Sequence, residues 1–197
     1  MKQAFPLIAL LVAFPAFAEE TRQLDAHEHG VGALDIAIYG TTVAMAFEAP
    51  GADIVGFEYA AKSDADHAAI DTALAALGAP LELFVMPDAA ACGVVEAQAD
   101  LEGGDGHEGH HEDHHDEGGH DTHADHDEDD HADDAGHTEF HAEYTLTCDN
   151  PDALTEITFA YFNAFPNAQE VDVQIITISG AHAFEVARDT PTLDLGR

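Results

Sequence analysis

GALDIAIYGTTVAMAFEAP, residues 32–50, alternates between apolar and small or polar residues on both sides of the pair Gly40-Thr41. Successive side chains of a β-strand point to opposite faces, so a period of two predicts a strand with one buried face. Two apolar sets would each share such a face: Leu34, Ile36 and Ile38 before the pair, and Val43, Met45 and Phe47 after it. The stretch therefore predicts a β-hairpin with its turn at Gly40-Thr41.

The segments around the hairpin predict one helix and several further strands. Ser63, with Asp66 three residues later, has the pattern of a capping box, and apolar residues recur at helical spacing up to Gly78. His67 shares the apolar face of this helix, so it is expected to be packed. Strand patterns occur at 81–85, 92–99, 137–148, 170–180 and 182–187, whereas 157–162 fits a strand or a helix. The sequence thus indicates an α+β fold, a mostly antiparallel sheet with one or two helices.

The first 18 residues, MKQAFPLIALLVAFPAFA, have the pattern of a secretory signal peptide. Lys2 gives a positive start, an apolar run follows, and Ala16-Phe17-Ala18 matches the small-x-small cleavage pattern. We expect cleavage after Ala18; the alternatives are a buried N-terminal strand or an uncleaved anchor. The apolar run is shorter than the ~20 residues that span a membrane, and no later segment is apolar enough. Residues 19–197 are therefore expected to form a single domain without membrane insertion.

Acidic residues dominate the charge of the chain. There are 40 Asp and Glu against five Lys and Arg, which gives a formal net charge of -35 at pH 7. So few cationic side chains cannot neutralise phosphates, which argues against nucleic acid and against anionic membrane surfaces as partners. The composition favours cations or basic partners, and its 15 histidines point to metal ions in particular.

The stretch HEGHHEDHHDEGGHDTHADHDEDDH, residues 107–131, holds nine histidines and eleven acids without a Lys or Arg. It cannot bury enough apolar surface to offset the entropy lost on ordering, so we expect a disordered loop at about residues 100–136. Imidazole nitrogens bind zinc, copper and nickel, and carboxylates complete such sites. A solvated acidic spacer is the alternative interpretation. The candidate ligands in this histidine tract are His107, His110, His111, His114, His115, His120, His123, His126 and His131.

Two cysteines, Cys92 and Cys148, lie on either side of the histidine tract. In an exported protein they would meet oxidising conditions, so we interpret them as a disulfide, with free thiols or metal ligands as the alternatives. Such a bridge would close the stem of the loop that carries the tract.

Other histidines lie on predicted strands, where metal ligands would be better ordered. The side chains of His27 and His29 would point to the same side of an extended chain, about 6.6 Å apart, close enough to share an ion. His137, Glu139 and His141 fall on the polar face of the strand at 137–148. The candidate site therefore joins His27 and His29 to His137 or His141, completed by Glu139, water or a histidine of the tract. It requires the two strands to be neighbours; otherwise these are solvated strand-end histidines.

The order of these features resembles the ZrgA-type zinc-uptake proteins of Gram-negative bacteria. The resemblance rests on HEHGVGALDIAI at 27–38, AFEAPGADIVGFEYA at 46–60, a single Cys92 before the tract, FHAEYTLTC at 140–148 and FNAFPNAQEVDVQII at 162–176. Its most specific part is Pro50 to Glu58, although Tyr59 stands where the family pattern leads us to expect histidine. The resemblance implies a periplasmic zinc-binding protein, not an enzyme, that assists an ABC-type zinc importer.

The residues alone also permit two other functions. Histidine and carboxylate donors suit copper and nickel as well as zinc, so the protein could instead be a buffer against an excess of these metals. A zinc-dependent hydrolase is the second alternative. It needs three fixed ligands, an open coordination position and a placed general base, whereas most of the donors lie in the histidine tract.

Overall fold

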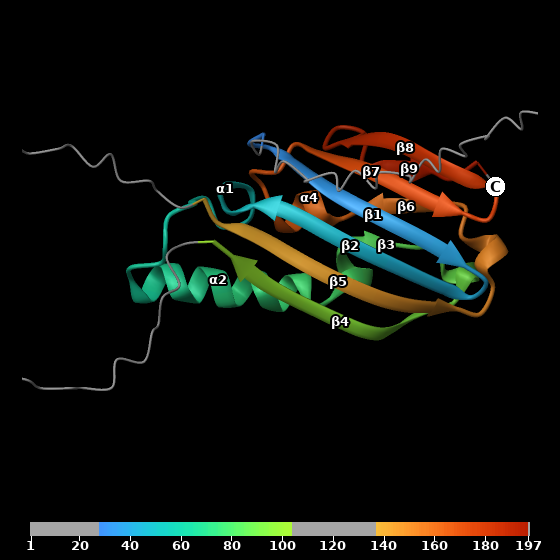
Figure 1. Cartoon of the computed structure of the whole chain (residues 1–197), viewed down its shortest axis with the longest axis horizontal. Helices are drawn as coiled ribbons and strands as arrows, with labels where there is room; N and C mark the ends of the chain where they lie inside the picture. Colours follow the sequence, from blue (N-terminus) through green and yellow to red (C-terminus); the bar gives the residue numbers. More distant parts are fainter. Residues whose placement is uncertain (1–27, 104–136, 197) are drawn as a thin grey trace, which may run out of the picture.

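The hairpin predicted at residues 32–50 forms the centre of a six-stranded sheet in the computed structural model, which describes residues 28–103 and 137–196 (Figure 1). Strand β1 (Val31–Tyr39) pairs antiparallel with β2 (Thr42–Pro50), and Tyr39 lies opposite Thr42. Gly40 in the turn has a φ of 59°, a conformation that costs glycine little because it has no Cβ. The six apolar residues that were predicted to face inward are all buried.

Four more strands complete the large sheet: β4 (Cys92–Glu102), β5 (Glu139–Cys148), β7 (Glu170–Thr177) and β8 (Gly180–Ala187). Their order is β4-β5-β2-β1-β7-β8. Among the described strands of this sheet, β1 and β7 are parallel and the other neighbouring pairs are antiparallel. The mostly antiparallel α+β fold predicted from the sequence is therefore confirmed.

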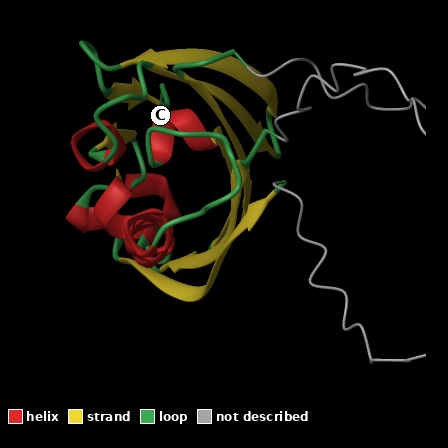
Figure 2. Ribbon diagram, turned by 90° about the vertical axis from the view of Figure 1, so that its left-hand side faces the viewer, coloured by secondary structure: helices red, strands yellow, loops and turns green. Residues whose placement is uncertain are grey.

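Short helices and a second, three-stranded sheet lie on one side of the large sheet (Figure 2). The small sheet consists of β3 (Phe84–Val85), β6 (Glu156–Phe159) and β9 (Thr192–Asp194), in the order β3-β6-β9. The helices are α1 (Gly51–Ile54), α2 (Asp64–Leu77), α3 (Pro80–Leu83) and α4 (Tyr161–Ala164), with 3-10 turns η1 (Asp88–Ala90) and η2 (Pro151–Ala153). None of the helices in the described residues has the length and apolar character needed to cross a membrane.

Helix α2 begins as the sequence predicted. The Ser63 side chain accepts a hydrogen bond from the Asp66 backbone N–H, and the Asp66 carboxylate accepts one from the Ser63 N–H, which makes a complete capping box. The packed position predicted for His67 is wrong, because its side chain is exposed. The buried residues of this helix, Ala73 and Leu77, lie in its second half, so the first turns are left to solvent.

Two apolar segments adopt mixed structures that periodicity could not resolve. The strand predicted at 81–85 is largely wrong: the chain there forms α3 and then the two residues of β3. Pro80 explains the difference, since its fixed φ favours the first turn of a helix. The segment 157–162, which fitted a strand or a helix, is strand β6 followed by the start of α4.

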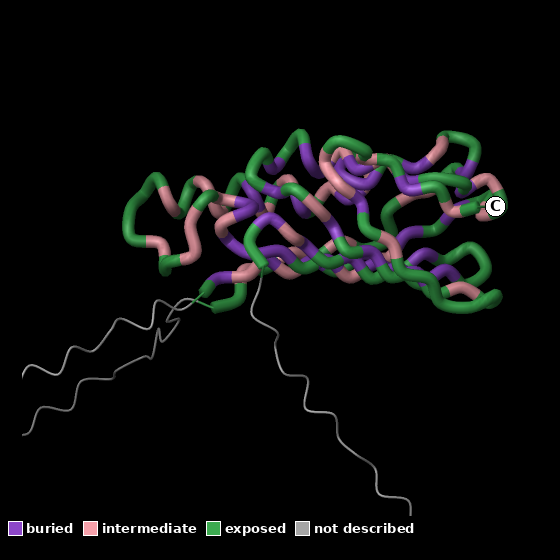
Figure 3. The backbone as a smooth tube through the Cα atoms, turned by 90° about the horizontal axis from the view of Figure 1, so that it is seen from above, coloured by how far each residue is buried: buried purple, intermediate pink, exposed green. Residues whose placement is uncertain are grey.

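Aromatic side chains hold the two layers together. The ring of Phe47 on β2 lies 5.1 Å from that of Tyr161 and 5.7 Å from that of Phe84 between centroids, and Phe84 in turn lies 5.4 Å from Phe159. All four residues are at most 1% exposed. Figure 3 shows buried and exposed positions alternating along the chain, as expected for strands with one buried face. The large sheet thus buries one face against these rings and leaves its other face uncovered by any described helix or strand.

The predicted disulfide between Cys92 and Cys148 is present. These two residues are register partners at the start of β4 and the end of β5. At the opposite end of the same strand pair, Glu102 lies opposite Glu139, so Gly103 and His137 bring both ends of the undescribed segment 104–136 to one place. The nine histidines of the tract lie in that segment and outside the described residues.

Candidate metal centre

His29, the first histidine that the structure describes, lies in a turn and not on a strand. Strand β1 begins at Val31, and Gly30 has a φ of 93°, so the prediction that His29 lies on the extended strand is wrong. The two carboxylate oxygens of Asp53 lie 2.8 and 3.0 Å from the Gly30 nitrogen and accept its N–H. This contact fixes the turn that presents His29 to solvent. His27 lies outside the described residues.

Asp53 is an unusual anchor because it is a carboxylate that is only 2% exposed. Burial raises its pKa, while the Gly30 N–H and the charge of His29 act in the opposite direction and reduce the shift. A buried carboxylate needs such partners, since desolvation disfavours its charged form. Asp53 therefore ties α1 to the turn before β1.

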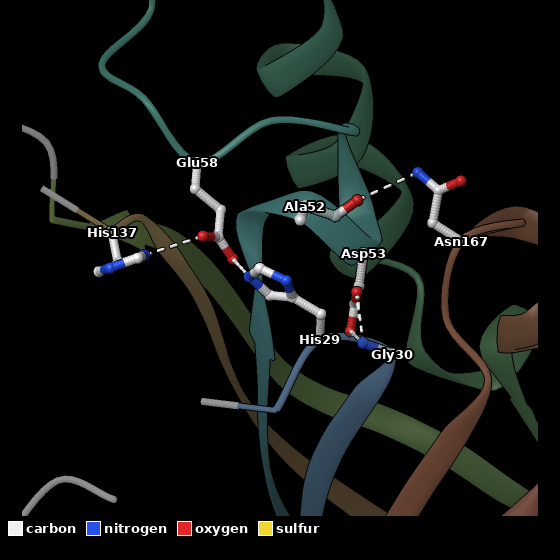
Figure 4. Close-up of polar contacts among 7 residues, drawn as sticks. All are labelled: His29, Gly30, Ala52, Asp53, Glu58, His137 and Asn167. Atoms are coloured by element: carbon white, nitrogen blue, oxygen red, sulfur yellow. Dashed lines mark hydrogen bonds and ion pairs between the residues drawn. The ribbon is translucent and has the colours of Figure 1, made fainter. Parts of the chain in front are cut away.

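Glu58, from the segment that follows α1, lies between two histidines (Figure 4). Its Oε1 is 2.9 Å from His29 Nε2, and its Oε2 is 2.8 Å from His137 Nδ1. The two histidine side chains are 66% and 73% exposed, whereas that of Glu58 is 15% exposed. We call His29, Glu58 and His137 the Glu58 cluster. It joins the turn before β1 to the residues before β5 through one carboxylate.

Close backbone packing holds the segment that carries Glu58. The Gly51 N–H donates to the Thr138 carbonyl at 2.7 Å, and a Cβ on Gly51 would lie 2.2 Å from Thr138 Oγ1 and 2.7 Å from the Phe57 carbonyl oxygen. On the other side of α1, Asn167 Nδ2 donates to the Ala52 carbonyl at 3.0 Å (Figure 4). Glycine at position 51 thus allows α1 to lie directly against the residues before β5.

The hydrogen bonds to Glu58 also indicate which nitrogen of each neutral ring carries the proton. A neutral imidazole carries one N–H, and an ionised carboxylate accepts but does not donate. With His29 Nε2 and His137 Nδ1 donating to Glu58, the remaining nitrogens, His29 Nδ1 and His137 Nε2, keep their lone pairs. A carboxylate that orients a histidine in this way is the usual second partner of a metal-ligating imidazole.

His141, predicted as an alternative ligand beside His29, belongs to a different group. Strand β2 lies between β1 and β5, so the two histidine-bearing segments are not neighbouring strands as the predicted site required. Around His141, Glu139 Oε2 lies 3.0 Å and Glu102 Oε2 3.6 Å from Nε2, and Glu48 Oε1 lies 3.8 Å from Nδ1. We call these four residues the His141 cluster. The structure therefore divides the predicted ligands, with His29 and His137 in one group and Glu139 and His141 in another.

Neither group is a ready-made metal site. Within residues 28–103 and 137–196, no three His, Cys, Asp or Glu side chains have the arrangement of a complete ligand set. The donors are oxygen and imidazole nitrogen, which suit zinc, and neither cysteine is available because both form the disulfide. Sequence reasoning missed Glu58, although it ends the PGADIVGFE stretch that is most specific for the family resemblance.

One comparison with known proteins is decisive. Residues 26–195 match the family description of ZrgA zinc uptake proteins. The chain belongs to the ZrgA family. This match spans both clusters, the disulfide and the histidine tract. No curated protein matches the chain at a significant level.

Membership of the ZrgA family supports zinc as the ligand and places the chain in a family of zinc uptake proteins, not of enzymes. The spacing H-E-x-x-H, which holds zinc in metalloproteases where it lies on a helix, does occur at residues 107–111 and 111–115. A tract with nine histidines among 25 residues produces such spacings by composition. Both copies lie outside the described residues.

The pH dependence of stability should report the Glu58 contacts in this ZrgA-family protein. Burial acts to raise the pKa of Glu58, but the hydrogen bonds and charges of His137 and His29 outweigh it and lower the pKa below the usual value of 4.5. A lowered folded-state pKa adds to the free energy of unfolding above pH 4.5, and this contribution is lost as the pH falls through the folded value.

Urea unfolding of the wild type and of Glu58→Gln between about pH 6 and pH 3 measures this contribution. The difference in unfolding free energy should be largest at pH 6 and shrink toward pH 3. Asp66, whose pKa is also lowered, first by the Lys62 backbone N–H, titrates in both proteins and cancels in the difference. If the difference in unfolding free energy stayed constant over this pH range, the charge of Glu58 would not contribute to stability.

Proposed function

We propose that the protein captures zinc in the periplasm and assists its uptake through an ABC-type importer. The observation that carries the proposal is the pair of histidines held by Glu58 in a chain of the zinc uptake family. The N-terminal pattern of a signal peptide, with cleavage after Ala18, supports export. The large excess of acidic residues supports the capture of a cation.

In this proposal the Glu58 cluster supplies the ordered, tighter site. His29 Nδ1 and His137 Nε2 are exposed lone pairs on rings that Glu58 holds in a fixed tautomer. In Figure 4 these nitrogens lie on the sides of the two rings that face away from Glu58, so one zinc ion held by both requires the exposed rings to turn, with water or a further donor completing the site. The contacts of Gly30 with Asp53 and of Gly51 with Thr138 hold the two histidine backbones near each other, so less entropy is lost when both rings bind an ion.

In this proposal the histidine tract increases the number of zinc ions that one chain binds. Nine imidazoles among eleven acids can hold more than one ion, since each zinc site uses about four donors. Imidazole binds metal only when neutral, so protons and zinc compete for these nitrogens. Copper and nickel would compete as well, and copper would bind more tightly at equal availability. A tract of this kind concentrates zinc near the ordered site and releases it readily.

Zinc titration calorimetry on residues 19–197, with and without residues 104–136, tests the proposal. The shortened chain should bind fewer zinc ions than the full mature chain and still bind at least one tightly. The reason is that all three residues of the Glu58 cluster lie outside the deleted segment. The deletion is sterically simple, since a Cβ on Gly103 would lie 2.0 Å from the His137 carbonyl oxygen and the two ends already touch. Circular dichroism would check that the sheet is retained. A folded shortened chain that binds no zinc would exclude the ordered site.

A further inference from the structure

Large apolar side chains gather at the end of the large sheet where β1 turns into β2. Seven large apolar residues are exposed in the part of the chain that the structure describes, and five of them lie at this end: Tyr39, Val94, Val95, Ile176 and Ile178. Tyr39 and Ile176 belong to the uncovered face, since Ile176 is the register partner of Ala37, two residues before Tyr39. Exposed apolar residues that cluster in this way are typical of an interaction surface.

A groove of about 570 Å³ opens on the uncovered face beside this apolar end. Ala37, Ala44 and Ala46 of the central strands β1 and β2 line it, together with the longer side chains of Gln98 on β4 and Gln174 on β7. Short side chains between longer ones leave a hollow along the two central strands. The helices and the small sheet lie on the other side of the large sheet (Figure 2), so no described element fills this hollow.

The charge of this face has one sign. Six exposed acidic side chains line the groove or follow it away from the apolar end: Asp35, Glu48, Glu96, Glu143, Asp172 and Glu185. The two cationic residues of the described chain belong to the other layer. Lys62 precedes α2, and the Arg188 guanidinium donates to the Phe162 carbonyl on α4. A surface of one sign attracts a partner of the opposite sign and repels one of the same sign.

We propose that the uncovered face of the large sheet docks a segment of a partner protein that carries lysine or arginine next to an apolar side chain. The apolar side chain lies in the groove against Ile176, and the basic side chains lie toward Glu48 and Asp172. The rows of Ala37 and Ala33, which mark these two ends, are four strand residues or about 13 Å apart. This inference goes beyond the proposed function and does not depend on zinc.

Charge also decides against two other occupants of the face. A second copy of the chain would bring an equally acidic face into contact with the first one. Residues 104–136 contain no lysine or arginine and many acids, so they too are repelled. A basic segment of another protein is the occupant that complements both the groove and its charge.

NMR of the metal-free mature chain, residues 19–197, with labelled alanine methyl groups tests the docking surface. The probe is a short peptide of two leucines, two alanines and three lysines, and the comparison peptide has glutamates in place of the lysines. The methyl signals of Ala37, Ala44 and Ala46, assigned by single substitution to serine, should shift and saturate with the lysine peptide alone. Added salt should weaken this binding, because the charges are exposed.

Two variants separate a specific groove from general attraction to an acidic protein. Asp35→Asn/Glu143→Gln should lower the affinity for the lysine peptide by about fivefold, since each exposed charge pair contributes little. The matched control Asp71→Asn/Glu82→Gln removes two exposed acids from α2 and α3 and should keep the wild-type affinity. Ala44→Gln fills the hollow without a change of charge and should also weaken binding. Circular dichroism checks that each variant is folded.

Several results would overturn the docking surface. Groove signals that ignore the lysine peptide, that respond equally to both peptides, or that weaken equally in the two double variants would each contradict it. Signals that move with protein concentration alone would assign the face to a second copy, and signals that move on deletion of residues 104–136 would assign it to that segment. Zinc titration of the same protein tests the proposed function separately, so either can fail without the other.

Discussion

Replacing His29 and His137 together by alanine should weaken the tight phase of zinc binding by about 100-fold or more, because loss of even an orienting partner costs 10- to 100-fold. Both nitrogens that we assign to the ordered site are then absent, and the carboxylate that held them has no partner ring. A 100-fold loss corresponds to about 2.7 kcal/mol of binding free energy. Weak binding by the histidine tract should persist unchanged.

Competition with a chelator of known zinc affinity, on the full mature chain, resolves the tight phase from the weak ones. The matched control is His67→Ala/His182→Ala, which removes the same number of histidines from exposed positions on α2 and β8. This control should keep the tight phase. A tight phase that survives in the His29→Ala/His137→Ala protein would place the ordered site elsewhere.

Glu58 variants give a graded version of the same experiment. Glutamine has one carbonyl oxygen and one NH2 group, so it can accept a hydrogen bond from only one of the two rings. Glu58→Gln should therefore weaken the tight phase by about tenfold, and Glu58→Ala by more, up to about 100-fold. Equal affinity in all three proteins would show that His29 and His137 are oriented by something other than Glu58.

The hairpin and the sheet were predictable because their signals are local. In residues 32–50 the apolar residues alternate with a period of two, and the turn residue Gly40 tolerates a positive φ. The capping box at Ser63 is likewise complete within four residues. Such patterns need no knowledge of which segments meet in space. The short helices α3 and α4 were not resolved, since four-residue elements carry too little periodicity.

The Glu58 cluster could be predicted only in part because its members meet through tertiary structure. His29 and His137 were selected by residue type, but their pairing depends on a carboxylate that follows α1 and is distant from both in sequence. The strand order, with β2 between β1 and β5, separates His141 from His29, and no local pattern encodes that order. The turn at Gly30 was also missed, because its cause is the buried carboxylate of Asp53, 23 residues away.

Removing the disulfide should produce the largest loss of stability, about 4 kcal/mol in the free energy of unfolding. Cys92 and Cys148 are separated by 56 residues, so the bridge excludes many conformations of the unfolded chain. We choose Cys92→Ala/Cys148→Ala because Cys148 is fully buried, where a serine hydroxyl would need a hydrogen-bond partner. Urea unfolding of this variant measures the loss.

Wild-type protein unfolded in the presence of a reductant is the control, because it lacks the bridge but keeps both sulfur atoms in place. Agreement between the reduced protein and the alanine variant would assign the loss to the bridge, and a smaller loss on reduction would assign part of it to packing. Wild-type protein recovered from the periplasm with two free thiols by mass measurement would contradict the bridge.

Loss of the disulfide should leave the zinc affinity nearly unchanged while it lowers the free energy of unfolding. Strand β5 begins two residues after His137 and carries Cys148 at its end, and its ten residues span roughly 33 Å. The bridge therefore acts at one end of the sheet, while the Glu58 cluster lies toward the other. As long as the sheet remains folded at the temperature of the titration, Gly51, Asp53 and Glu58 keep their contacts. A reduced protein that is folded but has lost its tight zinc phase would show that the cysteines contribute to the site itself.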